Sequence, residues 1–242
     1  GAFPYHLAWC GDIDLLGDRK PYSFYREALW KPGVLHIAVE KPLGDQDALI
    51  TEGWMHKWGW TPMESHWTWP GFEGQTMTVH IFSSCDEVAL LLNGNEMGRA
   101  RTTREERNRA KFQIPYLPGT LEAVGAGGER HVLRTAGEPV GIVLEAEPPS
   151  VGLRDDLRFV HIRLVDAAGV PAPNCDQAIT ATVVGTARLA ALGNADPKDV
   201  GSLQSGVSRT WKGRALAVAE VLGPGSSLVV RCGDAEASLP LD

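Results

Sequence analysis

The stretch TMTVHIFSSCDEVALLLNGNEMGR, residues 76–99, decides the fold of this chain. Between Thr76 and Ser83 apolar and polar side chains alternate, which is the period-two pattern of a half-buried strand. A second alternating run ends at Asn93-Gly94, the pair best suited to the two positive φ angles of a tight hairpin turn. The stretch therefore predicts antiparallel β-structure, in which the chain doubles back through Glu96.

Short strand-like runs separated by Pro and Gly continue on both sides of this hairpin. Outside the hairpin, strands are expected at residues 34–39, 110–114, 120–125, 130–135, 141–147, 158–166, 179–184, 187–192, 214–221 and 227–232. The predicted fold class is all-β, with two consecutive immunoglobulin-like β-sandwiches at residues 34–137 and 138–242. A fold of this kind brings no chemistry by itself.

Residues 1–33 contain a helical pattern instead. Pro21 stands where a helix can begin, Tyr22, Tyr25 and Leu29 follow at helical spacing, and Pro32 ends the pattern, so a helix is expected at about residues 21–30. The helix has an apolar stripe to bury and no partner within the first 33 residues, so we expect the chain to be a piece of something longer.

Asp12 and Asp14 form an obvious carboxylate pair, and two carboxylates are what glycoside hydrolysis needs. On an extended segment, positions i and i+2 lie roughly 6.6 Å apart on one side. A glycosidase draws its carboxylates from separate elements that face each other across a pocket. We therefore expect turn-forming and hydrogen-bonding roles for both residues.

Length and charge exclude several classes of function. A chain of 242 residues suits two domains of roughly 100 residues each. The net charge of -7, and the interruption of the basic run 99–111 by Glu105 and Glu106, argue against a nucleic-acid partner. The sequence has no apolar run long enough to cross a bilayer or act as a signal peptide, so we expect a soluble protein with no membrane partner.

Metal and cofactor sites are not expected. The cysteines form no C-x-x-C pair, and buried free thiols are the plainer interpretation, with disulfides as the alternative; they are Cys10, Cys85, Cys175 and Cys232. His56 and His66 lack a third ligand at a supporting spacing. The glycines at residues 125–128 follow a strand but precede no helix, so they form a turn and not a dinucleotide site. The motifs of nucleophile elbows, phosphate loops and zinc proteases are absent.

An aromatic insert between the first strand and the hairpin is the most unusual part of the composition. It reads WMHKWGWTPMESHWTWPG at residues 54–71. Exposed indole faces can stack on sugar rings, so the candidate substrate-binding residues are Trp58, Trp60, Trp67 and Trp69. The alternative is that the rings anchor the insert to a domain, since burying about 200 Å² of a Trp is worth roughly 5 kcal/mol. Trp58 and Trp60 are the better candidates for exposure, because Gly59 separates them.

Several motifs, in this order, resemble bacterial glycoside hydrolase family 2 enzymes of the β-galactosidase type. GDIDLLGDRKPYSFYREALW (11–30) resembles the end of the catalytic barrel. SHWTWPGFEGQTMTVHIFSSCDEVALLLNGNEMGR (65–99) and IPYLPGTLEAVGAGGERHVLRTAGEP (114–139) resemble the sandwich that follows the barrel. DLRFVHIRLVDAAGVPAPN (156–174) and LGNADP (192–197) resemble the family's immunoglobulin-like C-terminal domain.

The resemblance implies that residues 1–33 are a helical remnant of a (β/α)8 barrel and that both sandwiches are accessory domains. The catalytic glutamates of the family lie on earlier barrel strands, so no catalytic residue is expected here and the chain alone should be inactive. The implied partners are the upstream barrel, the carbohydrate substrate of a retaining enzyme, with galactoside as the guess, and a second copy in a homo-oligomer. The bacterial cytoplasm is preferred to secretion. The alternatives are an independent carbohydrate-binding module that uses the Trp insert, and an oligomerisation domain.

Overall fold

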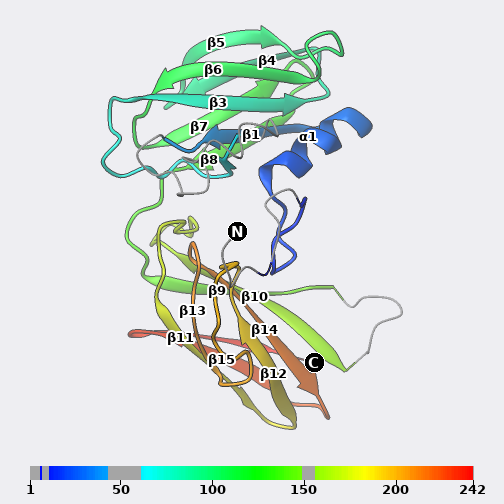
Figure 1. Ribbon diagram of the computed structural model, residues 1–242, viewed down its shortest axis with the longest axis vertical. Coiled ribbons are helices and arrows are strands. Elements are labelled where there is room, and N and C mark those ends of the chain that lie inside the picture. Colours follow the sequence, from blue (N-terminus) through cyan, green and yellow to red (C-terminus); the bar gives the residue numbers. More distant parts are fainter. Residues whose placement is uncertain (1–5, 7–10, 43–60, 149–155, 242) are drawn as a thin grey trace. The chain divides into compact units, whose positions relative to one another are not determined.

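The structure is a computed structural model that describes residues 6, 11–42, 61–148 and 156–241. Its chain forms two compact units, the first built mainly from residues 18–135 and the second mainly from residues 136–242 (Figure 1). Residues 11–14 also belong to the first unit, and His6 and residues 15–17 belong to the second.

The first unit is a sandwich of two antiparallel sheets with the strand orders β2-β1-β3-β6 and β5-β4-β7-β8. The strands are β1 (Leu35–Glu40), β2 (Met63–Glu64), β3 (Thr76–Ser83), β4 (Glu87–Leu92), β5 (Asn95–Arg101), β6 (Arg109–Pro115), β7 (Thr120–Gly125) and β8 (Arg130–Arg134). If β1, β3 and β6 are strands A, B and E, then β4, β7 and β8 are C, F and G, which is an immunoglobulin-like arrangement.

Alternation along the strands builds the core of this sandwich. On β3, Val79 and Ile81 are fully buried between the two sheets. The intervening His80 and Phe82 lie on the opposite face, away from the second sheet. The hairpin prediction is confirmed, because Asn93 and Gly94 join β4 to β5 with φ angles of 52° and 81°.

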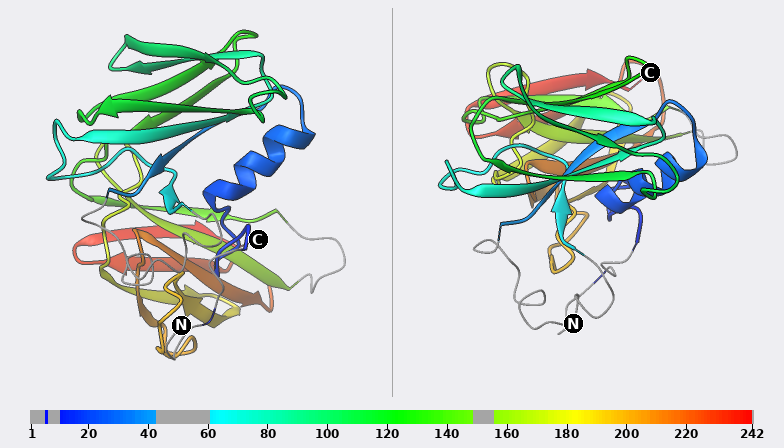
Figure 2. Two further views of the ribbon diagram at one scale, coloured as in Figure 1. Left: turned by 45° about the horizontal axis from the view of Figure 1, so that its top comes forward. Right: turned by 90° about the horizontal axis from the view of Figure 1, so that it is seen from above.

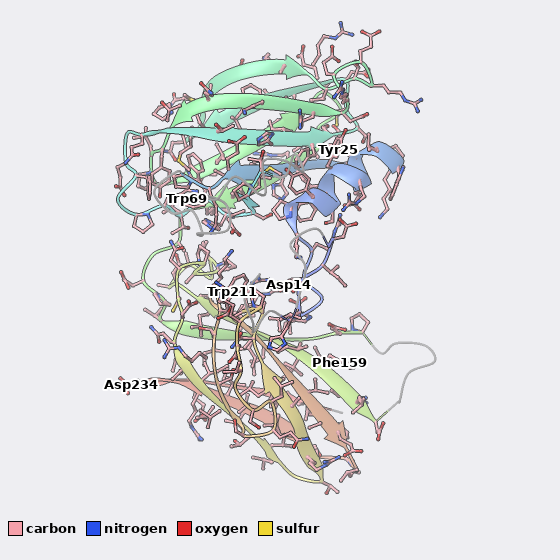
Figure 3. The ribbon with its side chains drawn as sticks, viewed as in Figure 1. Asp14, Tyr25, Trp69, Phe159, Trp211 and Asp234 are labelled. Carbon is pink, nitrogen blue, oxygen red and sulfur yellow. The ribbon has the colours of Figure 1, made fainter. Side chains whose placement is uncertain are left out.

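Helix α1 (Pro21–Trp30) packs on the outer face of the β2-β1-β3-β6 sheet (Figure 2). The bounds of the helix agree with the prediction. The ring of Tyr25 lies 5.4 Å from the ring of Phe82 on β3, on the sheet side of the helix (Figure 3). Ala28 is buried beside Ala38 of β1 in the same apolar cluster. The partner of the helical stripe is thus the first sandwich.

The second unit is also a sandwich of two antiparallel sheets, with the strand orders β12-β14-β10-β9 and β13-β11-β15-β16. The strands are β9 (Gly141–Ala146), β10 (Leu157–Val165), β11 (Ala178–Val184), β12 (Ala187–Gly193), β13 (Val207–Arg209), β14 (Arg214–Val221), β15 (Ser227–Cys232) and β16 (Ala235–Pro240).

The order of the strands identifies this second sandwich as immunoglobulin-like. With β9 to β12 taken as strands A to D, and β14 to β16 as E to G, one sheet has the order A-B-E-D and the other contains C-F-G. Strand β13 is an addition beside strand C. The predicted all-β class is therefore confirmed for both units.

Candidate functional site

Trp67 and Trp69 lie inside the first sandwich, with 0% and 3% of their surface exposed. The Nε1 of Trp67 donates a hydrogen bond of 3.0 Å to the carbonyl of Leu117, and its ring meets the ring of Tyr116 edge to face. The hydroxyl of Tyr116 accepts a hydrogen bond from the backbone of Trp69, which Figure 3 places in the first unit. The two rings are therefore enclosed by their own domain, as the anchoring alternative expects, and neither offers a face to a sugar. Trp58 and Trp60 lie outside the described residues.

Two chain segments, at residue 41 and at residues 61–64, are held close together beside the start of α1. We call this arrangement the insert neck, and define it by Tyr22, Lys41, Thr61, Pro62 and Glu64. The amide of Lys41 donates to the carbonyl of Pro62, and the amide of Thr61 donates to the hydroxyl of Tyr22 at 2.7 Å. The Lys41 ammonium lies 3.9 Å from the Glu64 carboxylate. The neck therefore ties residue 41 to residues 61–64 and both to the start of α1.

A polar cluster lies next to the insert neck on the outer face of the same sheet. Strand pairing places His80 beside Lys111, and both contact Glu40 at the end of β1. The Nε2 of His80 is 2.7 Å from the Glu40 carboxylate, and the Lys111 ammonium is 3.2 Å away. The hydrogen bond from His80 lowers the pKa of Glu40, and Lys111 adds to this effect while burial opposes it. Glu40 is therefore held in its ionised form.

A second polar cluster joins α1 to the sheet. The carboxylate of Glu27 contacts three nitrogens: the Arg19 guanidinium at 2.6 Å, the Lys31 ammonium at 2.9 Å and the Nε2 of His36 at 3.1 Å. Lys31 and Arg19 are the main reasons that the pKa of Glu27 is lowered to about 2. The ring of His36 stacks on Phe24 at 4.4 Å. The cluster thus fastens the helix to β1 and keeps Glu27 ionised.

His131 of β8 closes the open edge of β1. Among the described residues, β1 pairs with β2 only at Val39 and Glu40, and the amide of Ile37 has no strand partner on that side. The Nδ1 of His131 accepts a hydrogen bond of 3.3 Å from this amide. Nδ1 can accept only when it carries no proton. Burial, and secondarily the charge on nearby His36, lower the pKa of His131 to about 4, which keeps the ring neutral.

The carboxylates of Asp12 and Asp14 serve the local structure. Asp12 forms an ion pair with Arg26 of α1, in which the Nε of Arg26 donates at 2.7 Å. Asp14 accepts a hydrogen bond from the amide of Asp18 at 3.0 Å, and its own amide donates to the Asp18 carbonyl. The turn-forming interpretation is confirmed for Asp14, and Asp12 has the expected hydrogen-bonding role.

Three of the four cysteines lie in the described part of the chain. Cys85, Cys175 and Cys232 are buried free thiols, and burial raises the pKa of each. Cys10 and His56 lie outside the described residues. The Nδ1 of His66 accepts from the amide of Thr68. Within residues 6, 11–42, 61–148 and 156–241, no three His, Cys, Asp or Glu side chains gather as metal ligands, and no helix is long and apolar enough to cross a membrane.

Sequence reasoning did not find the Glu40, Glu27 and His131 clusters. Each joins side chains whose neighbourhood depends on strand pairing, such as Ile37 and His131, which are 94 residues apart. The available signal was weak. His80 and His36 are polar residues on faces that would otherwise be read as solvent-facing, and only the packing of α1 shows that this face is covered.

Comparisons with known proteins agree with the two sandwiches. Residues 142–233 match the model of glycoside hydrolase family 2 C-terminal domain 5. Residues 74–132 match a domain of unknown function, DUF4982. These ranges lie within the second and the first unit, respectively.

Solved structures extend the similarity over the whole chain. A glycosyl hydrolase family 2 member from Bacteroides cellulosilyticus is 30% identical, with a TM-score of 0.84, over 98% of this chain and 32% of its own. A β-glycosidase from Bacteroides vulgatus is 26% identical, with a TM-score of 0.76, over 95% of this chain and 27% of its own. A Formosa agariphila protein named "Putative beta-glucuronidase" is 29% identical over 138 residues, which are 56% of this chain and 11% of that protein.

Residues 142–233 therefore match a C-terminal domain of glycoside hydrolase family 2, and the chain as a whole is similar to a part of family 2 structures. It spans about a third or less of the length of the proteins that it matches. The β-galactosidase type expected from the sequence is not confirmed, because the relatives with a stated activity are named β-glycosidase or β-glucuronidase.

Proposed function

We propose that this chain forms the accessory C-terminal domains of a retaining β-glycosidase whose catalytic barrel precedes it in a longer polypeptide, here called the parent enzyme. The observation that carries the proposal is the similarity of 98% of the chain to one third of a family 2 structure. In this proposal, residues 1–33 are the end of the barrel, and the two sandwiches support it and shape the sugar entrance.

A supporting role fits the state of the carboxylates. A retaining glycosidase needs a protonated carboxylic acid and a nucleophilic carboxylate about 5.5 Å apart. Glu27 and Glu40 are held ionised by cationic partners, which is the wrong state for a proton donor. Asp12 is paired with Arg26, and Asp14 closes a turn. We therefore assign the proton-donor role to none of these residues, and their ion pairs and turn contacts fit a structural role.

The proposed sugar is a β-galactoside, on the basis of the accessory-domain resemblance. A β-glucuronide is the second candidate, and the name of the Formosa agariphila relative favours it. The two sugars differ at C6, where a glucuronide carries a carboxylate that needs a cationic partner in the site. The ratio of kcat/KM for nitrophenyl β-galactoside and nitrophenyl β-glucuronide, measured on the parent enzyme, decides between them.

The role of the domains is tested separately from the sugar. We expect the 242-residue chain to elute from a β-glycan affinity gel like a non-binding protein, because Trp67 and Trp69 are enclosed. Retention that is lost on Trp58→Ala or Trp60→Ala would support an independent carbohydrate-binding module instead. The solution mass, measured by light scattering, tests the proposed homo-oligomer. If the oligomer of the parent enzyme dissociates when these domains are deleted, the result would support a role in assembly.

A further inference from the structure

The loop between β12 and β13 of the second sandwich is organised by one side chain, that of Asn194. Its Nδ2 donates to the carboxylate of Asp199 at 2.6 Å and to the hydroxyl of Ser208 at 3.5 Å. Its Oδ1 accepts from the amide of Asp196 at 2.8 Å. The side-chain amide of Asn194 thus supplies both the donor and the acceptor of this network.

This loop holds His6 through two hydrogen bonds. The amide of His6 donates to the carbonyl of Pro197 at 2.8 Å. The Nε2 of its ring is 2.9 Å from the carbonyl of Asp199, and a carbonyl only accepts, so Nε2 carries the proton. The hydrogen bond of the His6 amide fixes the position of the backbone, and the hydrogen bond of the ring fixes the direction of the side chain. His6 and the loop belong to the same compact unit, although His6 is separated from it by almost the whole chain.

The position of His6 in the sequence gives this contact a functional meaning. His6 precedes by five residues the run 11–30, which resembles the end of a family 2 catalytic barrel. A C-terminal loop that seats a residue from this part of the chain can transmit its own position to the barrel. Small displacements matter there, because a misplacement of about 1 Å can cost about a hundredfold in rate.

We propose that Asn194 is a positioning residue of the parent enzyme, which shapes the 194–199 loop as a docking surface for His6. This inference rests on the proposed function. The Pro197 and Asp199 carbonyls accept from His6, and Asn194 sets their spacing by binding the Asp196 amide on one side of Pro197 and the Asp199 carboxylate on the other. The second sandwich thus acts on the reaction through His6, without touching substrate.

The contact is tested first in the 242-residue chain, where no activity is needed. We expect Asn194→Ala to speed amide hydrogen exchange at His6 by about three- to tenfold, the effect of losing one ordinary hydrogen bond. Gln204→Ala is the matched control, because Gln204 is exposed in the same β12–β13 connection, outside the 194–199 loop, and the hydrogen bond given for it is made by its backbone amide. Unchanged exchange at His6 in Asn194→Ala would overturn the docking role.

A matched pair at His6 separates the ring hydrogen bond from ring packing. His6→Gln retains a donor near the position of Nε2, whereas His6→Phe retains a ring without a donor. In the parent enzyme we expect His6→Phe and Asn194→Ala to lower kcat/KM by about three- to tenfold, and His6→Gln to recover most of the loss. The double variant Asn194→Ala/His6→Phe should lose no more than the larger single variant, because both remove one contact.

The two failures can be told apart. If the unmodified parent enzyme does not hydrolyse β-glycosides, the proposed function fails, and the exchange measurement still decides whether Asn194 seats His6. If the parent enzyme is active and both Asn194→Ala and His6→Phe keep its kcat/KM, the positioning role is wrong. Equal losses in His6→Gln and His6→Phe would also contradict it, since they would show that the donor is irrelevant.

Discussion

His131 gives the first sandwich a pH dependence that the structure allows us to calculate. In the folded protein its pKa is lowered to about 4, against 6.5 for an exposed histidine, mainly because the ring is buried. Between pH 6.5 and 4, His131 therefore binds a proton in the unfolded chain but remains neutral in the folded chain. At about 1.4 kcal/mol for each pH unit, the loss of stability approaches about 3 kcal/mol at pH 4.

The sign follows from the direction of the pKa shift. The full stability of the first unit is present above pH 6.5, where His131 is neutral in both states. It falls as the pH decreases toward 4 and levels off below, where His131 is protonated in both states. Protonation also removes the acceptor for the Ile37 amide, so the edge of β1 loses its closing hydrogen bond.

The variant that isolates this effect is His131→Asn. The Oδ1 of Asn lies close to the position of the His Nδ1 and can accept from Ile37, but Asn does not titrate. The free energy of opening of the first unit should decrease between pH 7 and pH 4 in the unmodified chain. We expect the decrease to be about 3 kcal/mol smaller in His131→Asn. His161→Asn in the second unit is the control, because His161 lies outside the first unit.

The assay is denaturant-dependent hydrogen exchange of the peptide that covers β3, because β3 lies at the centre of the first unit and reports on its opening alone. The difference between the two proteins matters, since other groups also titrate in this range, including His36, whose pKa is lowered by burial. Parallel pH profiles of His131→Asn and the unmodified chain would refute the assignment of a neutral, acceptor Nδ1.

Three further predictions concern the Trp residues and the helix. Trp69→Ala should destabilise the first unit by about 3–5 kcal/mol, as expected for a buried Trp, and should leave the KM of the folded parent enzyme unchanged in kinetic assays. Trp58→Ala or Trp60→Ala should weaken transition-state binding by the parent enzyme, calculated from kcat/KM, by about 1–3 kcal/mol, which is the free energy of a base stacked on an aromatic ring. Unchanged kinetics in both variants would show that the insert has only a structural role. Glu27→Gln should destabilise the first unit at pH 7 by about 1–3 kcal/mol in the exchange assay, and the difference should shrink as the pH falls from 4.5 toward 2, where Glu27 itself takes up a proton.

Local patterns predicted the elements of the fold well. The bounds of α1, β7, β14 and β15 agree with the expected ranges, and the Asn93-Gly94 turn has the expected dihedral angles. The strands that were missed are β2, β13 and β16. β2 and β13 have two and three residues, too few for a period to appear, and β16 reads AEASLP, with small side chains that give little contrast between its faces.

The candidate site was harder to predict, because its contacts join distant parts of the chain. The burial of Trp67 depends on Leu117 and Tyr116, about fifty residues further on. Composition could show that the insert is rich in Trp but not which rings the sandwich encloses. In the same way, Asn194 belongs to a run with a family resemblance. The hydrogen bonds by which it shapes the loop that binds His6 appear only in the structure.

The decisive assay is hydrolysis of nitrophenyl β-glycosides, with the intact parent enzyme and the 242-residue chain measured side by side at equal molar concentration. We expect turnover with retention of configuration by the parent enzyme, and none by the chain alone. Turnover by the purified 242-residue chain that disappears in an Asp14→Asn variant would contradict this expectation, because the catalytic machinery would then lie within these domains.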